Sequence, residues 1–415
     1  MPGRAAVADQ KLTLAAAREM ALKSHPRITT AQLRALIARE GMTQARAGYL
    51  PSIAANATAV YSGEAVTRIA SGTLSNSQIF DHTGVGATLS FLVTDFGRTA
   101  ALNDAAKSRV RAADADAIAT RAQLLLQVNA AYLDVLKAQA VKGVAEKTLA
   151  TRQAMFTRTS ALAQNQLRSE LDVRLAQVSV DEARLLIDGA EKDVQSAVTT
   201  LANLIGDATI PATRTLEIPP APAEVPADFA PLTALALQQR PELARYRAEA
   251  EAARSAARAA RDARRPTISL LASAGYVPVD HPQFDTKYAA GGVNLNLPLF
   301  AGGLYRSRQR EAELQANAAD AATQDTINTI TRDVRLAWLE AVHARERIGL
   351  TDRLAENATA ALTLARARFE QGLSSTVELT QAELAQTSAE IARSTADYAY
   401  RVRREILDFQ TGTLR

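Results

Sequence analysis

Apolar and polar residues alternate with a period of two in two parts of the chain, which predicts β-strands with one apolar face. The first part begins at Ser52, and its two alternating runs are separated by the polar stretch 62–82. The same alternation returns from Thr267. The apolar positions combine alanine with larger aliphatic and aromatic side chains, and the opposite positions are mostly small or polar. We therefore expect two β-hairpins, 52–93 and 267–299, the first with the longer loop.

Helical periodicity occupies most of the remaining chain in unusually long tracts. No proline lies between Pro51 and Pro211, and none follows Pro298. Because proline costs about 3 kcal/mol inside a helix, both tracts are free to form long helices. The pattern predicts two long helices and two return helices: 98–164, 171–205, 304–370 and 377–409. Each long helix would extend about 100 Å at a rise of 1.5 Å per residue.

The chain contains an internal duplication, visible in three pairs of segments at one offset. Residues 128–136 (VNAAYLDVL) match residues 334–342 (VRLAWLEAV), which lie 206 positions further along. The same offset pairs 93–97 with 299–303 and 171–173 with 377–379. A repeat this long exceeds a solenoid unit. It predicts two copies of one large structural half.

The repeat sets the expected domain organisation. A flexible leader (1–11) precedes the first repeat (12–208), which opens with two shorter helices separated at Pro26. A proline-rich linker (209–231) holds six of the fourteen prolines, and the second repeat covers 232–410. Paired prolines, Pro26 and Pro51 in the first repeat and Pro241 and Pro266 in the second, mark the same 25-residue step.

Composition removes several classes of function. There are 48 Lys and Arg against 44 Asp and Glu, giving a net charge of +4, and no basic patch with interleaved aromatics supports nucleic-acid binding. The absence of cysteine excludes disulfides and thiolate chemistry. No run approaches the ~20 apolar residues of a membrane-spanning helix, and no secretory signal is visible at the start.

The sequence predicts no enzyme, metal site or cofactor. The four histidines are scattered without the spacing of a metal site or catalytic triad. Asp95-Phe96-Gly97 matches a kinase tripeptide, but the other kinase motifs are missing. These residues, with Gly302 and Gly303 in the second repeat, are instead expected to turn the chain from strand into helix.

The strands have two possible environments. A soluble sheet packed on helices explains the alternation, and so does a transmembrane barrel, whose strands need ~9–11 residues. The alanine-rich apolar faces offer little side-chain volume for packing a soluble core. A long helix also follows each hairpin directly. Four strands cannot close a barrel, and an open edge cannot lie in lipid. A membrane barrel would therefore need strands from further chains.

The order and spacing of these motifs resemble the TolC family of bacterial outer-membrane channel proteins over residues 12–410. The resemblance rests on the paired prolines, the strand-to-helix turns, the Tyr132-Leu-Asp and Trp338-Leu-Glu repeats, and the helix breaks before Leu171 and Val377. It implies an α+β membrane protein: a long helical tunnel continuous with a transmembrane β-barrel completed by trimerisation, with four strands per chain.

The resemblance also implies a function and partners. The chain would be the outer-membrane exit channel of a tripartite efflux or type I secretion system, passing drugs, metals or proteins through a periplasmic tunnel. Its partners would be two further copies, a periplasmic adaptor, an inner-membrane pump driven by protons or by ATP (an ABC transporter), and outer-membrane lipid. No nucleic acid and no cofactor are implied. The alternative is a soluble periplasmic coiled-coil adaptor or scaffold, which would carry β-rich domains rather than duplicated strand–helix halves.

The same resemblance assigns site residues. The tips that contact the adaptor are Gln166, Leu167, Arg168, Ser169, Gly372, Leu373, Ser374 and Ser375. The family usually has glycine at both breaks, whereas this chain has Gln166 at the first. The pore constriction would comprise Glu378, Gln381 and Asp172. A ring of carboxylates on the axis binds cations, but an acid near a helix N-terminus is equally explained by the helix dipole.

Overall fold

The protein was analysed as a computed structural model that describes residues 11–61, 67–70, 76–79, 82–207, 211, 215–278 and 285–414. All but the last residue of the predicted leader lies outside them. The described helices are α1 (Leu14–Ser24), α2 (Pro26–Ala47), α3 (Arg98–Gln164), α4 (Glu170–Ile205), α5 (Ala230–Gln239), α6 (Pro241–Asp262), α7 (Leu304–Glu370) and α8 (Thr376–Thr411). The described strands are β1 (Ser52–Val60), β2 (Thr67–Ala70), β3 (Asn76–Ile79), β4 (His82–Thr94), β5 (Thr267–Tyr276) and β6 (Lys287–Asn296).

The chain forms two compact units, and neither coincides with one sequence repeat. Unit 1 comprises residues 1–32, 116–243 and 325–415, and unit 2 comprises 33–115 and 244–324. Each unit therefore takes segments from both repeats. The long helices α3 and α7 contribute their first turns to unit 2 and the rest to unit 1.

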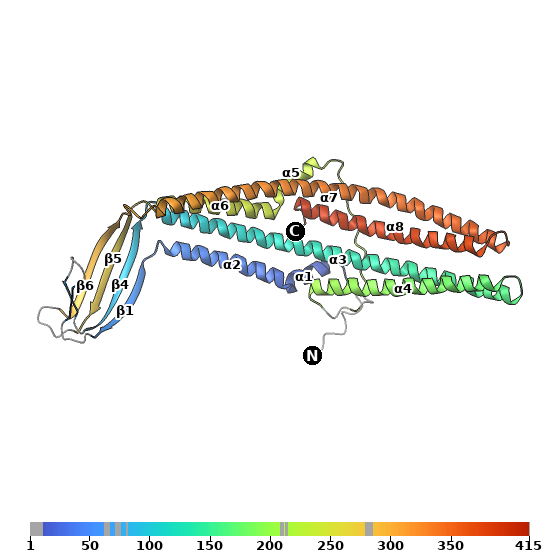
Figure 1. The fold of residues 1–415 in the computed structure, drawn as a ribbon, viewed down its shortest axis with the longest axis horizontal. Coiled ribbons are helices and arrows are strands. Elements are labelled where there is room, and N and C mark those ends of the chain that lie inside the picture. Colours follow the sequence, from blue (N-terminus) through green and yellow to red (C-terminus); the bar gives the residue numbers. More distant parts are fainter. Residues whose placement is uncertain are drawn as a thin grey trace. The chain divides into compact units, whose positions relative to one another are not determined.

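Unit 2 contains a four-stranded antiparallel sheet in the order β1-β4-β5-β6 (Figure 1). The register places Ile53, Leu89, Ala272 and Gly291 in one row across the sheet. Since side chains alternate between faces, this row belongs to the face that carries the apolar positions of every strand. Strands β4 and β5 join the two repeats, and β1 and β6 are the edges of the sheet.

Two predictions about irregular segments need correction. The polar stretch 62–82, predicted as a loop, contains the short antiparallel pair β2 and β3, which is separate from the predicted four-stranded sheet. Strands of four residues are too short to show a reliable alternation. The linker, predicted as irregular through Pro231, ends earlier because α5 begins at Ala230. Proline is tolerated there because the first helical turn needs no donor from its backbone nitrogen.

The helix boundaries follow local chemistry that is repeated in the two halves. Helices α3 and α7 have 67 residues each, and α4 and α8 have 36 each. Gly206 and Gly412, 206 positions apart, end α4 and α8 with φ values of 72° and 78°. This left-handed conformation is the usual glycine-terminated helix end. The predicted return helices differ from α4 and α8 by at most two residues at each end.

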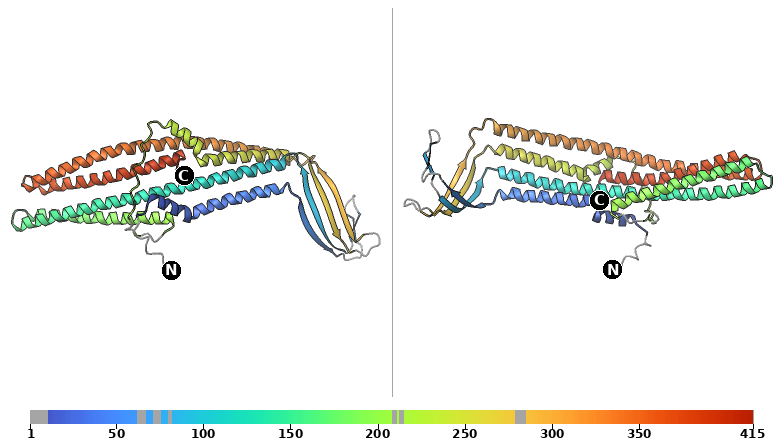
Figure 2. Two further views of the ribbon diagram at one scale, coloured as in Figure 1. Left: turned by 180° about the vertical axis from the view of Figure 1, so that it is seen from behind. Right: turned by 60° about the horizontal axis from the view of Figure 1, so that its bottom comes forward.

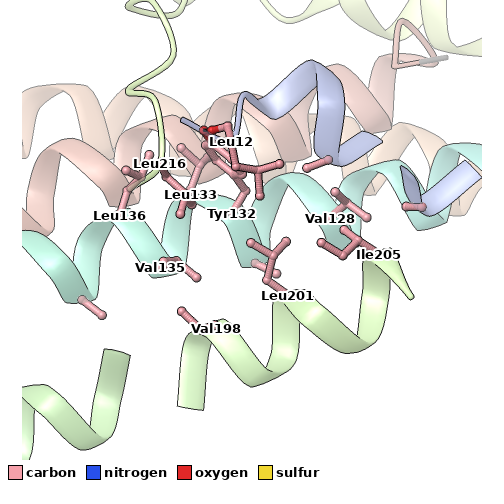
Figure 3. Close-up of a cluster of buried hydrophobic side chains, with 14 of the residues drawn as sticks. Leu12, Val128, Tyr132, Leu133, Val135, Leu136, Val198, Leu201, Ile205 and Leu216 are labelled. Carbon is pink, nitrogen blue, oxygen red and sulfur yellow. Dashed lines mark hydrogen bonds between the residues drawn. The ribbon is translucent and has the colours of Figure 1, made fainter. Parts of the chain in front are cut away.

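The largest buried cluster of unit 1 surrounds Tyr132, within the duplicated stretch (Figure 3). It joins α1, α3, α4 and the linker at Leu216. The Tyr132 hydroxyl lies 2.6 Å from the carbonyl oxygens of both Leu12 and Glu217. Burial raises the pKa of Tyr132 to about 12, so the phenol stays neutral and donates its one proton to either carbonyl. Tyr132 thereby anchors the start of the first repeat and the linker to α3.

Trp338, the repeat partner of Tyr132, performs the same task with different chemistry. Its indole Nε1 donates to the Pro226 carbonyl at 2.8 Å, and its ring lies 5.7 Å from that of Phe229. Tyr132 is buried and Trp338 is half-buried, and each uses one polar atom to bind linker backbone. The duplicated stretch is where the linker is attached to the helices.

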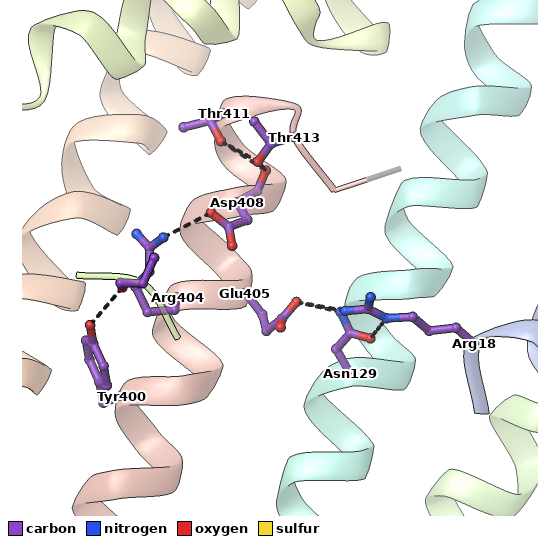
Figure 4. A network of polar contacts seen from close by, with 9 residues as sticks. Arg18, Asn129, Tyr400, Arg404, Glu405, Asp408, Thr411 and Thr413 are labelled. Carbon is purple, nitrogen blue, oxygen red and sulfur yellow. Dashed lines mark hydrogen bonds and ion pairs between the residues drawn. The ribbon is translucent and has the colours of Figure 1, made fainter. Parts of the chain in front are cut away.

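A buried polar network connects α1, α3 and α8 in unit 1 (Figure 4). Arg18 Nε donates to Asn129 Oδ1 at 2.7 Å, and both Asn129 Nδ2 and Arg18 Nη2 donate to Glu405 Oε2. Burial raises the pKa of Glu405, and Arg18 opposes that shift. Each polar group of this network therefore has a partner, as buried polar groups require.

Candidate functional site

The candidate site lies at the two helix–turn–helix tips of unit 1, where α3 meets α4 and α7 meets α8 (Figures 1 and 2). The two turns have the same backbone hydrogen bonds. Leu167 N donates to Leu162 O at 2.9 Å, and Leu373 N donates to Arg368 O at 2.8 Å. Each turn places one residue in the left-handed region, Gln166 at φ 60° and Gly372 at φ 73°. Gln166 therefore adopts in the first turn the conformation that Gly372 adopts in the second, and its Cβ makes that conformation strained.

Both return helices begin with a serine cap. Ser169 Oγ accepts from Asp172 N, and Ser375 Oγ accepts from Glu378 N, each at 3.2 Å. In the first tip the cap is reciprocal, because the Asp172 carboxylate also accepts from Ser169 N at 3.1 Å. Asp172 and Glu378 thus occupy equivalent positions but have different bonds. The carboxylate of Asp172 closes a capping box, whereas that of Glu378 takes no part in the cap.

Asp172 also connects the two tips. The Thr376 hydroxyl donates a short hydrogen bond to Asp172 Oδ1. This bond is the main reason that the pKa of Asp172 lies below its usual value, with smaller contributions from Ser169 and Arg168. The ionised carboxylate is therefore the form that holds α4 to α8 at the tips.

Two arginines add further links between the tips. Arg168 donates from Nη2 to the Phe369 carbonyl at 2.9 Å, and its guanidinium lies 4.0 Å from the centroid of the Phe369 ring. Arg158 Nη1 lies 2.6 Å from Glu370 Oε1 on the exposed surface. A cation over an aromatic ring contributes about 0.5–1 kcal/mol at exposed sites and more when shielded from water. The tips are thus held together by several weak contacts.

Large apolar side chains are exposed on both tips at equivalent positions. Leu167 and Leu171 are 69% and 66% exposed, and Leu373 and Val377 are 64% and 54% exposed. Leu171 and Val377 were absent from the predicted tip residues, although the repeat itself marked them as partners. Four exposed apolar residues in matched turns form a small surface suited to a partner.

The predicted constriction residues differ in exposure and in the number of side-chain contacts. Glu378 is half exposed, and its Oε1 lies 3.6 Å from Arg368 Nη1, beyond hydrogen-bonding distance. Gln381 is exposed one turn further along α8. Asp172, by contrast, is occupied by Ser169 and Thr376. Of the two acids in this set, Glu378 therefore has the fewer side-chain contacts, a single ion pair with Arg368.

The strand-to-helix turns belong to unit 2 and have a positioning role. The buried Asp95 accepts from Thr99 N at 2.8 Å and Thr99 Oγ1 at 2.6 Å, which caps α3. Gly97, Gly302 and Gly303 have φ values of 109°, 57° and 84°. Such values favour glycine, which explains the glycines of the two repeated turns.

An ionic cluster with two buried members, Arg152 and Glu383, lies just inside the tips and was missed by sequence reasoning. Arg152 on α3, 4% exposed, contacts Glu182 on α4 at 3.1 Å. Arg366 on α7 lies 3.6 Å from the 7% exposed Glu383 on α8. Nothing in the sequence separates these residues from the many exposed charges at helical spacing. Among the described residues, no group of three or more acidic or histidine side chains could hold a metal ion.

In its described parts, the chain has no helix that combines the length and the apolar character needed to cross a bilayer. The model of one family, described as outer membrane efflux protein, matches residues 17–207 and 232–413. Both repeats are therefore matched, with the linker between them left out.

Two curated relatives and two solved structures illustrate the similarity. Outer membrane protein OprJ of Pseudomonas aeruginosa is 30% identical over 311 residues, which are 72% of this chain and 63% of OprJ. The toluene efflux pump outer membrane protein TtgI of Pseudomonas putida is 26% identical over 74% of this chain and 66% of TtgI. The matched region thus spans slightly less than two thirds of these relatives.

The solved structures match the fold along almost the whole chain. A membrane protein from Pseudomonas aeruginosa superposes with a TM-score of 0.82 at 26% identity, covering 96% of this chain and 93% of that one. The outer membrane protein VceC from Vibrio cholerae gives a TM-score of 0.82 at 22% identity, covering 96% of both chains.

We expect the substitution Gln166→Gly to raise the thermal midpoint of the purified protein, by an amount corresponding to about 0.5–1 kcal/mol. A residue with a Cβ atom in the left-handed conformation costs roughly 1–2 kcal/mol, and the greater freedom of glycine when unfolded offsets part of that gain. Circular dichroism in detergent measures the midpoint.

The matched control is Gly372→Ala, which adds a Cβ at the equivalent position. No atom lies within 4 Å of that Cβ, so only the backbone conformation opposes it, and the midpoint should fall. A fall for Gln166→Gly, or no change in either variant, would contradict the assignment of strain to these turns.

Proposed function

The chain belongs to the outer membrane efflux protein family, and from this premise we propose that it is the outer-membrane exit channel of a tripartite efflux system. Membership confirms the resemblance to the TolC family, the outer-membrane location and the prediction that the chain is not an enzyme. The observation that carries the proposed channel is the architecture of each half: a strand hairpin leads directly into one uninterrupted helix that ends at an exposed tip.

We propose that three copies complete the channel. The four-stranded sheet has two unpaired edges, β1 and β6, and one face of apolar residues. An unpaired edge cannot remain in lipid, because each free backbone group there costs several kcal/mol. Pairing β6 of one copy with β1 of the next satisfies both edges. Three copies give twelve strands, within the range of known barrels.

The tips are proposed as the contact with a periplasmic adaptor, itself coupled to an inner-membrane pump. The exposed residues Leu167, Leu171, Leu373 and Val377 support this role. They lie beside polar backbone turns with the same geometry in both repeats. A partner that repeats one binding element could therefore engage both tips in the same way.

Glu378 is proposed as the ion-selective residue of the constriction, with Gln381 and Asp172 near it. Three copies would bring three Glu378 carboxylates around one axis, where they attract cations and repel anions. As cargo we propose small molecules, since the relative TtgI is named for toluene efflux.

We expect Glu378→Ala to reduce the cation-over-anion permeability ratio of the channel in planar bilayers by a factor of about five. Three carboxylates about 10 Å from an axial cation in water stabilise it by roughly 1 kcal/mol in sum. The control is Glu170→Ala, which removes an exposed acid from the other tip. Unchanged selectivity in Glu378→Ala would rule out the constriction role.

We expect Leu373→Glu to weaken adaptor binding and export by about tenfold or more. In the complex, an apolar side chain covered by the adaptor would be replaced by a charge that must lose its water. The control is Asn357→Glu, which adds the same charge to exposed α7 surface away from the tips. Pull-down with the adaptor and export in cells are the measurements. Normal export by a correctly assembled Leu373→Glu protein would contradict the proposal that the tips contact the adaptor.

A further inference from the structure

Glu383 is a buried carboxylate on α8, about one and a half turns beyond Glu378 and just inside the tips. Its neighbours come from three other helices of unit 1. Arg366 approaches from α7 and Arg152 from α3, and Arg152 in turn contacts Glu182 on α4. The cluster therefore includes residues from all four helices that carry the two tips.

Few hydrogen bonds or close positive charges offset the cost of burying the Glu383 carboxylate. Its Oε1 has no hydrogen bond, and the nearest guanidinium nitrogen, Arg366 Nη2, lies 3.6 Å away. Arg152 directs Nη1 to Ser179 O at 2.8 Å and to Glu182, and its Nε has no partner. A buried charge without good hydrogen bonds is costly. Glu405, a half-buried acid of the same helix, accepts from both Asn129 and Arg18 instead.

A polar cavity of about 450 Å³ adjoins this carboxylate. Thr148 and Arg152 line it from α3, and Glu383, Gln386, Thr387 and Glu390 line it from α8. The other charged groups that face it are Lys147 from α3 and Arg366 from α7. The cavity lies beside the carboxylate, whose Oε1 is itself shielded from solvent in the packed state.

The physical consequence is a link between protonation and packing. Burial raises the pKa of Glu383, and the charges of Arg366 and Arg152 only partly oppose that shift. If α8 separates from α3, water reaches the carboxylate and its pKa returns towards the ordinary glutamate value of 4.5. The packed state then binds the proton more tightly, so lower pH favours packing and higher pH favours separation. The transition lies above pH 4.5.

We propose that Glu383 is a positioning residue that couples proton binding to the contact between the two tips, with α8 packed on α3 when Glu383 is neutral and loosened when it is ionised. The proposal rests on the proposed function in one respect, namely that the tips form the entrance of the channel. It adds a regulator distinct from the exposed Glu378.

The test is a distance measured between the tips of one chain as pH changes. The sequence has no cysteine, so Asn165→Cys and Gln371→Cys, both at exposed positions, take spin labels without background. Labelled protein is mixed with excess unlabelled protein in detergent, and pulsed electron paramagnetic resonance gives the distance distribution from pH 5 to pH 8. We expect the ratio of separated to packed populations to rise with pH, by up to about tenfold per pH unit for one proton per chain.

Three variants separate the cluster from other acids. Glu383→Gln should retain the packed distance at every pH. Arg366→Met removes a charge that favours the carboxylate, so the midpoint of the transition should move to higher pH. Glu405→Gln changes a half-buried acid of α8, far from the tips along the helix, and should keep the pH response of the parent protein.

A tip distance that does not change from pH 5 to pH 8 would overturn the proposal, and so would a full pH response in Glu383→Gln. The measurement requires no transport. A protein with the pH response that fails to conduct ions would therefore refute the proposed channel alone. A protein that conducts ions but whose tip distance does not change with pH would refute the role of Glu383 alone.

Discussion

The architecture depends on two helices that nothing interrupts. Helices α3 and α7 each run for 67 residues from a strand-to-helix turn to a tip, and neither contains proline. A single proline inside either would cost about 3 kcal/mol and bend the helix. The prolines instead occur where the chain must break, as at Pro26 and Pro241, which begin α2 and α6. Each long helix therefore joins a strand hairpin to a turn of fixed geometry.

Duplication preserved geometry more strictly than chemistry. Gln166 and Gly372 share the left-handed conformation, and Tyr132 and Trp338 both bind linker carbonyls through one polar atom. The equivalent acids at the starts of α4 and α8 make different contacts. Asp172 accepts a hydrogen bond from Thr376, whereas Glu378 is half exposed. The acid of the first half thus connects the two tips, whereas the acid of the second half pairs at 3.6 Å with Arg368 of its own tip.

Sequence reasoning succeeded where the information is local. Periodicity, proline and glycine predicted the long helices, their ends and the strands of the main sheet within a few residues, because each depends on near neighbours in the chain. It failed for the strands β2 and β3, which are too short to show a pattern. It also gave no hint of Glu383 or Thr376, because a polar residue's distant partner is set by packing and leaves no fixed spacing in the sequence.

The central claim is that this chain forms a membrane channel only with copies of itself, because its sheet has two open edges. The most direct measurement is the native mass, in detergent, of protein extracted from outer membranes. The account predicts particles of three chains of 44.3 kDa each, in which disulfides engineered between β1 and β6 form between chains. A monomer that remains dispersed without detergent would contradict it, since the four strands would then form a sheet that is stable in water without further copies.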